Sequence, residues 1–164
     1  GAHARKACHA ARAAGWTVRG FVDDAVDAVS PIQDVPVFAP GDLPFPAAGQ
    51  SIFIAIGNPV VRRRLVERVV GEGWALATIV HPLAWVAPDA IIDAGVIVAA
   101  GAVVETRARI GRGTIVDIGV AVDHDCRVGE FCHLRPGQVL QPATVLASSP
   151  AGDSGKGRTA PGEA

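Results

Sequence analysis

The segment best suited to chemistry is Asp123-His124-Asp125-Cys126, where a histidine stands between two carboxylates. A nearby negative charge favours the imidazolium form, so an adjacent acid can orient a histidine and make it more basic. A neutral His124 could take a proton from an amine or hydroxyl while that group attacks an electrophile. The alternative is a solvated histidine at a corner of the chain, and the segment taken by itself favours this alternative.

Three other segments could bind a ligand. Gly1-Ala2-His3 leads directly into an expected helix, whose first N–H groups can hold a phosphate. Asp23-Asp24 ends an expected strand, where ligand hydroxyls commonly bind in α/β proteins, although a plain turn is equally consistent. Gly57-Asn58 follows another expected strand and indicates either a tight turn or a close backbone approach to a ligand.

The remaining reactive residue types receive structural interpretations. The arginine run at residues 62–64 is interpreted as the solvated face of a helix. His9 and His81 are assigned to structure, and Cys126 and Cys132 to packed interior positions.

A six-residue repeat in the second half of the chain must position His124. An aliphatic residue recurs at every sixth position without a miss, at Val86, Ile92, Val98, Val104, Ile110, Val116, Val122, Val128, Leu134, Leu140 and Leu146. The residue four positions after each of these is mostly small or medium. This period is typical of a parallel β-helix, in which three hexads complete one triangular coil with the aliphatic residue inside. An ordinary sheet would have a period of two.

The same period places outward-facing residues in columns spaced by 18. One column holds Trp85, Val103, Ala121 and Val139, and another holds Ile97, Ile115 and His133. Exposed apolar columns on a three-sided prism indicate self-association about a threefold axis. His133 lies nine residues after His124, half a coil away, so the two histidines should face different edges of one subunit. If they act together, they meet across a subunit boundary.

Residues 1–80 have a different pattern, in which strand-like and helix-like segments alternate. We expect helices over residues 3–14 and 60–70, with Pro59 at the start of the second. We expect strands over residues 17–22, 51–56 and 74–80. This alternation predicts a small parallel α/β domain, whose first strand would precede Gly1.

The composition excludes several classes of protein. The chain of 164 residues is 49% hydrophobic and 19% charged, which favours a packed core over disorder. A net charge of −1 with no long basic block argues against a nucleic-acid-binding protein. With no apolar run long enough for a membrane span and no signal peptide, we expect a soluble cytoplasmic protein. Three cysteines form neither a disulfide framework nor a zinc pattern, so no metal site is expected.

Taken in order, the segments of this chain resemble those of one family. They are GAHAR at the start, FVDD at 21–24, FIAIGN at 53–58, IVHP at 79–82, the hexapeptide repeats, VDHDC at 122–126 and GEFCHLRPG at 129–137. Their order and spacing resemble the sugar acetyltransferases of the NeuD/PglD type. This family includes sialic-acid O-acetyltransferases and UDP-4-amino-sugar N-acetyltransferases, and the resemblance covers residues 1–146.

The resemblance implies a fold of two domains. A Rossmann-like domain over residues 1–80 would bind a nucleotide sugar, and a left-handed β-helix over residues 81–147 would assemble as a homotrimer. Compared with the family, the Rossmann-like domain lacks its first strand and the β-helix is truncated at its C-terminal end. The Gly/Ser/Pro/Ala-rich stretch over residues 148–164 is expected to be a flexible tail.

The resemblance also implies a reaction. Acetyl-CoA would transfer its acetyl group to an amino or hydroxyl group of a nucleotide-linked sugar, in glycan biosynthesis. His124 matches the family's general base, Asp125 the acid that makes it more basic, and His133 a residue that contacts acetyl-CoA. The residues that match the nucleotide-sugar contacts are Gly1, Ala2, His3, Asp23, Asp24 and Gly57. The alternative is a non-catalytic relative that trimerises or binds a nucleotide sugar without transferring acetyl.

Overall fold

The computed structural model describes residues 1–25, 27–43 and 49–151. The predicted tail therefore falls mostly on residues 152–164, which lie outside the described residues. Its first part is held against the rest of the chain, because the Ser149 N–H donates to the Glu130 carbonyl at 2.9 Å and the Ser148 hydroxyl accepts from the Glu130 N–H at 2.8 Å.

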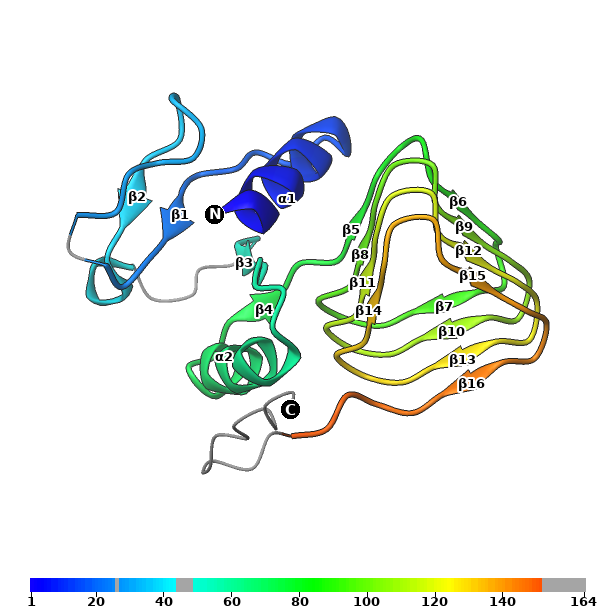
Figure 1. The fold of residues 1–164 in the computed structure, drawn as a ribbon. Helices are drawn as coiled ribbons and strands as arrows, with labels where there is room; N and C mark the ends of the chain where they lie inside the picture. Colours follow the sequence, from blue (N-terminus) through cyan, green and yellow to red (C-terminus); the bar gives the residue numbers. More distant parts are fainter. Residues whose placement is uncertain (26, 44–48, 152–164) are drawn as a thin grey trace, which may run out of the picture.

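The second half of the described chain forms a triangular coil of short parallel strands, which confirms the predicted β-helix (Figure 1). Its three sheets have the strand orders β14-β11-β8-β5, β15-β12-β9-β6 and β16-β13-β10-β7. The strands are β5 (Ile79–Val80), β6 (Trp85–Val86), β7 (Ile91–Ile92), β8 (Ile97–Val98), β9 (Val103–Val104), β10 (Arg109–Ile110), β11 (Ile115–Val116), β12 (Ala121–Val122), β13 (Arg127–Val128), β14 (His133–Leu134), β15 (Val139–Leu140) and β16 (Val145–Leu146).

The core of the coil is the aliphatic column that the repeat predicts. From Val98 to Leu140 every sixth residue is buried, and so are the smaller residues between them, including Cys126 and Cys132. Paired strands are 18 residues apart in register, as in Val116 with Leu134. Because burying one Val or Ile side chain stabilises a fold by roughly 1.5–3 kcal/mol, this column can hold the coil together.

The described residues of the first half form two α-helices and two two-stranded parallel sheets, β1-β2 and β3-β4. Helix α1 (Ala2–Ala13) and helix α2 (Pro59–Gly71) lie within one residue of their predicted bounds. Asn58 caps α2, since its side chain accepts from the N–H groups of Val60 and Val61. The remaining elements are β1 (Phe21–Val22), β2 (Val37–Phe38), the 3-10 helix η1 (Pro40–Asp42), β3 (Ser51–Ile52) and β4 (Ala75–Leu76).

The strands of this half are shorter than predicted. A strand needs a hydrogen-bonded neighbour, and within residues 17–22 only Phe21–Val22 pairs with another described segment, β2. The strand expected over residues 74–80 is two strands, because β4 pairs with β3 whereas β5 pairs with β8 of the coil. The chain therefore joins the coil at Ile79.

Helix α1 lies against the β14-β11-β8-β5 sheet of the coil (Figure 1). Its Ala7, Ala10 and Ala11 pack on Ile79, Ile97 and Ile115. The prediction that Ile97 and Ile115 form an exposed column is therefore wrong, because α1 of the same chain covers them. The other predicted column is exposed at Trp85 and Val139, at 55% and 59%. In the described ranges no helix is both long and apolar enough to cross a membrane.

Candidate active site

His124 lies in the turn that joins β12 to β13, at a corner of the coil. Its Nδ1 is 2.7 Å from Asp125 Oδ2, and its backbone N–H donates to Asp123 Oδ1 at 2.7 Å. Its carbonyl accepts from the Ala143 N–H of the next coil at 2.9 Å. The backbone is thus fixed on both sides, while about half of the imidazole remains accessible at 48%.

Asp125 occupies a corner position that repeats every six residues and has a positive φ throughout. These positions are Gly95, Gly101, Arg107, Gly113, Gly119, Asp125, Phe131, Gly137 and Ala143. A residue other than glycine costs roughly 1–2 kcal/mol in this conformation, and such strain concentrates at functional sites. Here it places Asp125 one coil above Arg107, and the two side chains meet.

Arg107 holds the carboxylate of Asp125 with two hydrogen bonds, of 2.6 Å from Nε and 2.7 Å from Nη2. The hydrogen bonds from Arg107 and from His124 keep the pKa of Asp125 well below its ordinary value. An ionised carboxylate only accepts hydrogen bonds, so the proton of a neutral His124 lies on Nδ1. The lone pair of Nε2 is then free to accept a proton.

A hollow of about 230 Å³ lies beside this corner. It is lined by Asp89, Ile91, Arg107, Arg109, Asp125 and Arg127. Its three guanidinium groups outnumber its two carboxylates, so the lining of the hollow carries a net positive charge.

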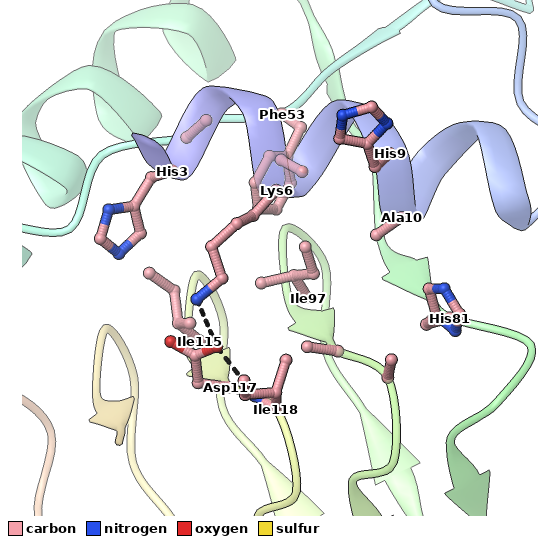
Figure 2. A pocket seen from close by; sticks show the side chains of 14 residues that line it. His3, Lys6, His9, Ala10, Phe53, His81, Ile97, Ile115, Asp117 and Ile118 are labelled. Carbon is pink, nitrogen blue, oxygen red and sulfur yellow. Dashed lines mark hydrogen bonds and ion pairs between the residues drawn. The ribbon is translucent and has the colours of Figure 1, made fainter. Parts of the chain in front are cut away.

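A second polar cluster lies between α1 and the coil, at one end of a cavity of about 260 Å³ (Figure 2). Lys6 reaches from α1 to Asp117 of the coil, with 2.6 Å between Nζ and Oδ1. His133 Nε2 is 3.4 Å from the other oxygen of Asp117. The rings of His3 and His133 meet edge to face, with centroids 5.5 Å apart.

Two groups of this cluster, His3 and Asp117, have shifted pKa values. The pKa of His3 is lowered, first by burial and then by the neighbouring His133 and Lys6. Burial alone would raise the pKa of Asp117, but hydrogen bonds from Lys6, from the Ile118 N–H and from His133 hold it below the ordinary value. At neutral pH the cluster therefore offers a neutral imidazole beside a carboxylate and an ammonium group. The far end of the cavity is lined by His9 and His81, both assigned to structure from the sequence (Figure 2).

The structure brings two of the predicted nucleotide-sugar residues together. Gly57 lies against His3 so closely that a Cβ built at Gly57 would be 3.0 Å from His3 Cε1. Gly1 is the N-cap of α1 and Ala2 its first residue, and both are exposed.

The acidic pair of the first sheet is not part of this cluster. Asp23 and Asp24 are exposed just after β1, where Asp23 Oδ1 accepts from the Ala25 N–H at 3.1 Å. Among the described residues no hydrogen bond or ion pair joins these two carboxylates to His3.

The two polar clusters lie on different sides of the coil within one chain. His133 is on β14, in the sheet that α1 covers, whereas His124 lies between strands of the other two sheets. The expectation that the two histidines face different edges of one subunit is therefore confirmed.

Comparisons with known proteins relate the chain to enzymes of one type. The family model of the PglD N-terminal domain matches residues 1–69. A solved structure of GDP-perosamine N-acetyltransferase from Caulobacter crescentus, with one histidine replaced by alanine and with CoA and GDP-perosamine bound, is 34% identical. The match covers 90% of this chain and 73% of that chain, with a TM-score of 0.78. This chain belongs to the left-handed β-helix sugar acetyltransferases.

A second member of this acetyltransferase family is similar in structure. The acetyltransferase domain of PglB from Neisseria gonorrhoeae, solved with acetyl coenzyme A, is 28% identical, with a TM-score of 0.78. The match covers 90% of this chain and 82% of that domain. No curated protein sequence matches the chain.

Sequence reasoning missed four residues that the structure places at or beside these clusters, namely Lys6, Arg62, Arg107 and Asp117. The sequence held a signal for Arg107, because it lies 18 residues before Asp125. This spacing is one full coil and places a positive charge next to the predicted acid. The interpretation of Arg62 as part of a solvated helix face is wrong. Arg62 is buried, because the coil covers the side of α2 from which it projects.

Proposed function

We propose that this protein transfers the acetyl group of acetyl-CoA to an amino group of a nucleotide-linked sugar. The observation that carries the proposal is the Arg107–Asp125–His124 arrangement, which leaves Nε2 of His124 free as a proton acceptor. The related enzymes from Caulobacter and Neisseria support an acetyl donor and, in the first case, a nucleotide-linked amino sugar as acceptor. An amine is therefore favoured over a hydroxyl as the acceptor.

In the proposed reaction the lone pair of the acceptor nitrogen attacks the carbonyl carbon of the thioester. The new C–N bond forms a tetrahedral intermediate, which collapses as the C–S bond breaks and the CoA thiolate leaves. His124 Nε2 removes a proton from the nitrogen during the attack and returns one to the departing sulfur. General-base catalysis of this kind contributes roughly 10²–10⁴-fold in rate.

The cavity beneath α1 is proposed as the acceptor site. At about 260 Å³ it is smaller than the roughly 300–1,000 Å³ of a typical drug-sized pocket, so it suits one sugar ring better than a whole nucleotide sugar. His3, Lys6 and Asp117 offer hydrogen-bonding groups at its polar end. The remaining predicted contacts at Gly1, Ala2, Asp23, Asp24 and Gly57 would hold the nucleotide.

A homotrimer is proposed because one chain does not bring His124 to the cavity. The exposed column of Trp85 and Val139 on the β15-β12-β9-β6 sheet supports association of the coils. Each active site would then take its base from one copy and its cavity from the next. His133, matched to a residue that contacts acetyl-CoA, would lie where donor and acceptor meet.

The test is CoA release measured with a thiol reagent, using acetyl-CoA with GDP-perosamine or a UDP-4-amino-sugar. We expect acceptor-dependent release by the wild-type chain and a kcat lower by about 10²–10⁴-fold in His124→Asn. The exposed Arg68→Gln serves as a control that keeps the wild-type rate. If the folded wild-type chain binds the nucleotide sugar but releases no CoA, it is a non-catalytic relative and the proposal fails.

A further inference from the structure

Arg62, in the first turns of α2, is 1% exposed and fully enclosed by backbone carbonyl groups. Its Nε donates to Gly113 at 2.7 Å. Its Nη1 donates to Ile56 and Gly57, each at 2.7 Å. Its Nη2 donates to Phe131 at 2.7 Å and to Cys132 at 3.1 Å. All five N–H groups of the guanidinium are therefore used, and every acceptor is a carbonyl oxygen.

This environment is specific for arginine. Burying a cation is costly unless its hydrogen bonds are satisfied, and burial lowers the pKa of Arg62 to about 10. Five acceptors arranged around one plane match the fixed fork of a guanidinium. A lysine at this position has three donors on one nitrogen and would leave several of the five carbonyls without a partner.

Two of the five carbonyls lie next to the histidines of the second polar cluster. Gly57, whose carbonyl accepts from Nη1, lies directly against the ring of His3. Cys132, whose carbonyl accepts from Nη2, directly precedes His133 on β14. Arg62 thus connects the backbone behind His3 with the backbone behind His133, and the two rings are 5.5 Å apart.

We infer that Arg62 is a positioning residue for acceptor binding, which holds His3 and His133 in register across the junction of the two halves of the chain. The inference rests on the proposed function, because it assigns the cavity lined by His3 to the acceptor. Arg62 itself is enclosed by protein and touches neither substrate, so it acts through Gly57 and Cys132.

Arg63 provides a matched control. It projects from the same helix to the same region of the coil, where its guanidinium lies 4.3 Å from the centre of the Phe131 ring and donates to the Ser149 carbonyl at 2.8 Å. It also lies 3.5 Å from Glu130. Within the described part of the chain Arg63 makes no hydrogen bond to Gly57 or Cys132, so loss of Arg63 loosens α2 without releasing the backbone behind the two histidines.

The first test compares Arg62→Lys with Arg63→Lys in the full chain labelled with ¹³C-histidine. The chain has five histidines, so each Cε1–Hε1 signal can be followed separately. We expect Arg62→Lys to shift the signals of His3 and His133 and to leave those of His9, His81 and His124 in place. Arg63→Lys should leave all five in place. Equal shifts of all five signals, or none in the folded variant, would overturn the inference.

The second test separates positioning from stability by kinetics. In Arg62→Lys we expect the KM for the nucleotide amino sugar to rise at least tenfold. The KM for acetyl-CoA should rise by a clearly smaller factor, because of the two displaced rings only His133 is matched to a contact with acetyl-CoA. If both KM values rise by the same factor and the only other change is a lower Tm, the role of Arg62 is structural and the inference is overturned. If the wild-type chain shows no transfer, the proposed function fails, and the histidine signals still decide whether Arg62 positions the two rings.

Should Arg62→Lys not fold, Arg62→Ala with added guanidinium ion replaces it, with methylammonium as the control cation. Guanidinium can satisfy the same planar set of carbonyls, so it should restore both the fold and the wild-type signals of His3 and His133. Restoration of the fold without these signals, or no restoration at all, would overturn the inference.

Discussion

Arg107 and Asp125 show how a corner of the coil can orient His124, the proposed base. Both take a backbone conformation that the neighbouring corners mostly give to glycine. At these two corners the strain accompanies an ion pair between side chains of successive coils. The ion pair they form keeps Asp125 ionised and thereby fixes the tautomer of His124.

At the residue scale, Arg107→Gln should make activity more sensitive to acid. Removing the largest cause of the lowered pKa of Asp125 lets that pKa rise towards its ordinary value of about 3.9. A protonated Asp125 no longer accepts from Nδ1 of His124, so the variant should lose more of its kcat/KM than wild type as pH falls from about 5 to about 3.5. Arg68→Gln is the control, and pH profiles of equal shape for Arg107→Gln and wild type would contradict the role of the ion pair.

His3 makes a second prediction at this scale, about stability. Its pKa is lower in the folded chain than in the unfolded chain, so the unfolded chain binds the proton more readily. Stability should therefore fall as pH drops through the unfolded value of about 6.5, and stop falling below the folded pKa. Thermal melts between pH 7.5 and 5 should show a smaller loss of Tm for His3→Gln than for wild type. Equal losses would contradict the shift.

At the scale of elements, the coil can be predicted from the sequence because each six-residue repeat forms one side of the triangular coil. The inward column from Val98 to Leu140 is buried as predicted. The identical substitutions Val116→Ala and Val145→Ala test this, since Val116 points into the core and Val145 is exposed on β16. We expect a loss of about 2 kcal/mol in the free energy of unfolding for Val116→Ala and less than about 0.5 kcal/mol for Val145→Ala, measured with urea. Similar losses would contradict the assignment of the two faces.

The residues that sequence reasoning missed depend on contacts between distant elements. Arg62 lies in a polar run at helical spacing, which is typical of a solvated face, and its burial depends on carbonyls at Gly113, Phe131 and Cys132. Asp117 is an ordinary turn residue until Lys6 of α1 reaches it, more than a hundred residues away. Ile97 and Ile115 look like an exposed column until α1 covers them. A local pattern contains none of this information.

At the scale of the whole molecule, the two polar clusters are separated. His124, the proposed base, and the cluster of His3 and His133 lie on different sides of one coil. Under the proposed function a working site needs two copies of the chain, each contributing one cluster. The second half of the chain would then have two roles, since it carries the proposed base and also presents the exposed column.

Mixing two inactive variants tests this claim most directly. His124→Ala lacks the proposed base, and the double variant His3→Ala/Lys6→Ala lacks the polar end of the cavity. When equal amounts are unfolded and refolded together, half of the sites should receive an intact base and half of these an intact cavity, so we predict CoA release at about a quarter of the wild-type rate. Mixed oligomers that form, as shown by tagging one variant, but release no more CoA than either variant alone would contradict a site shared between copies.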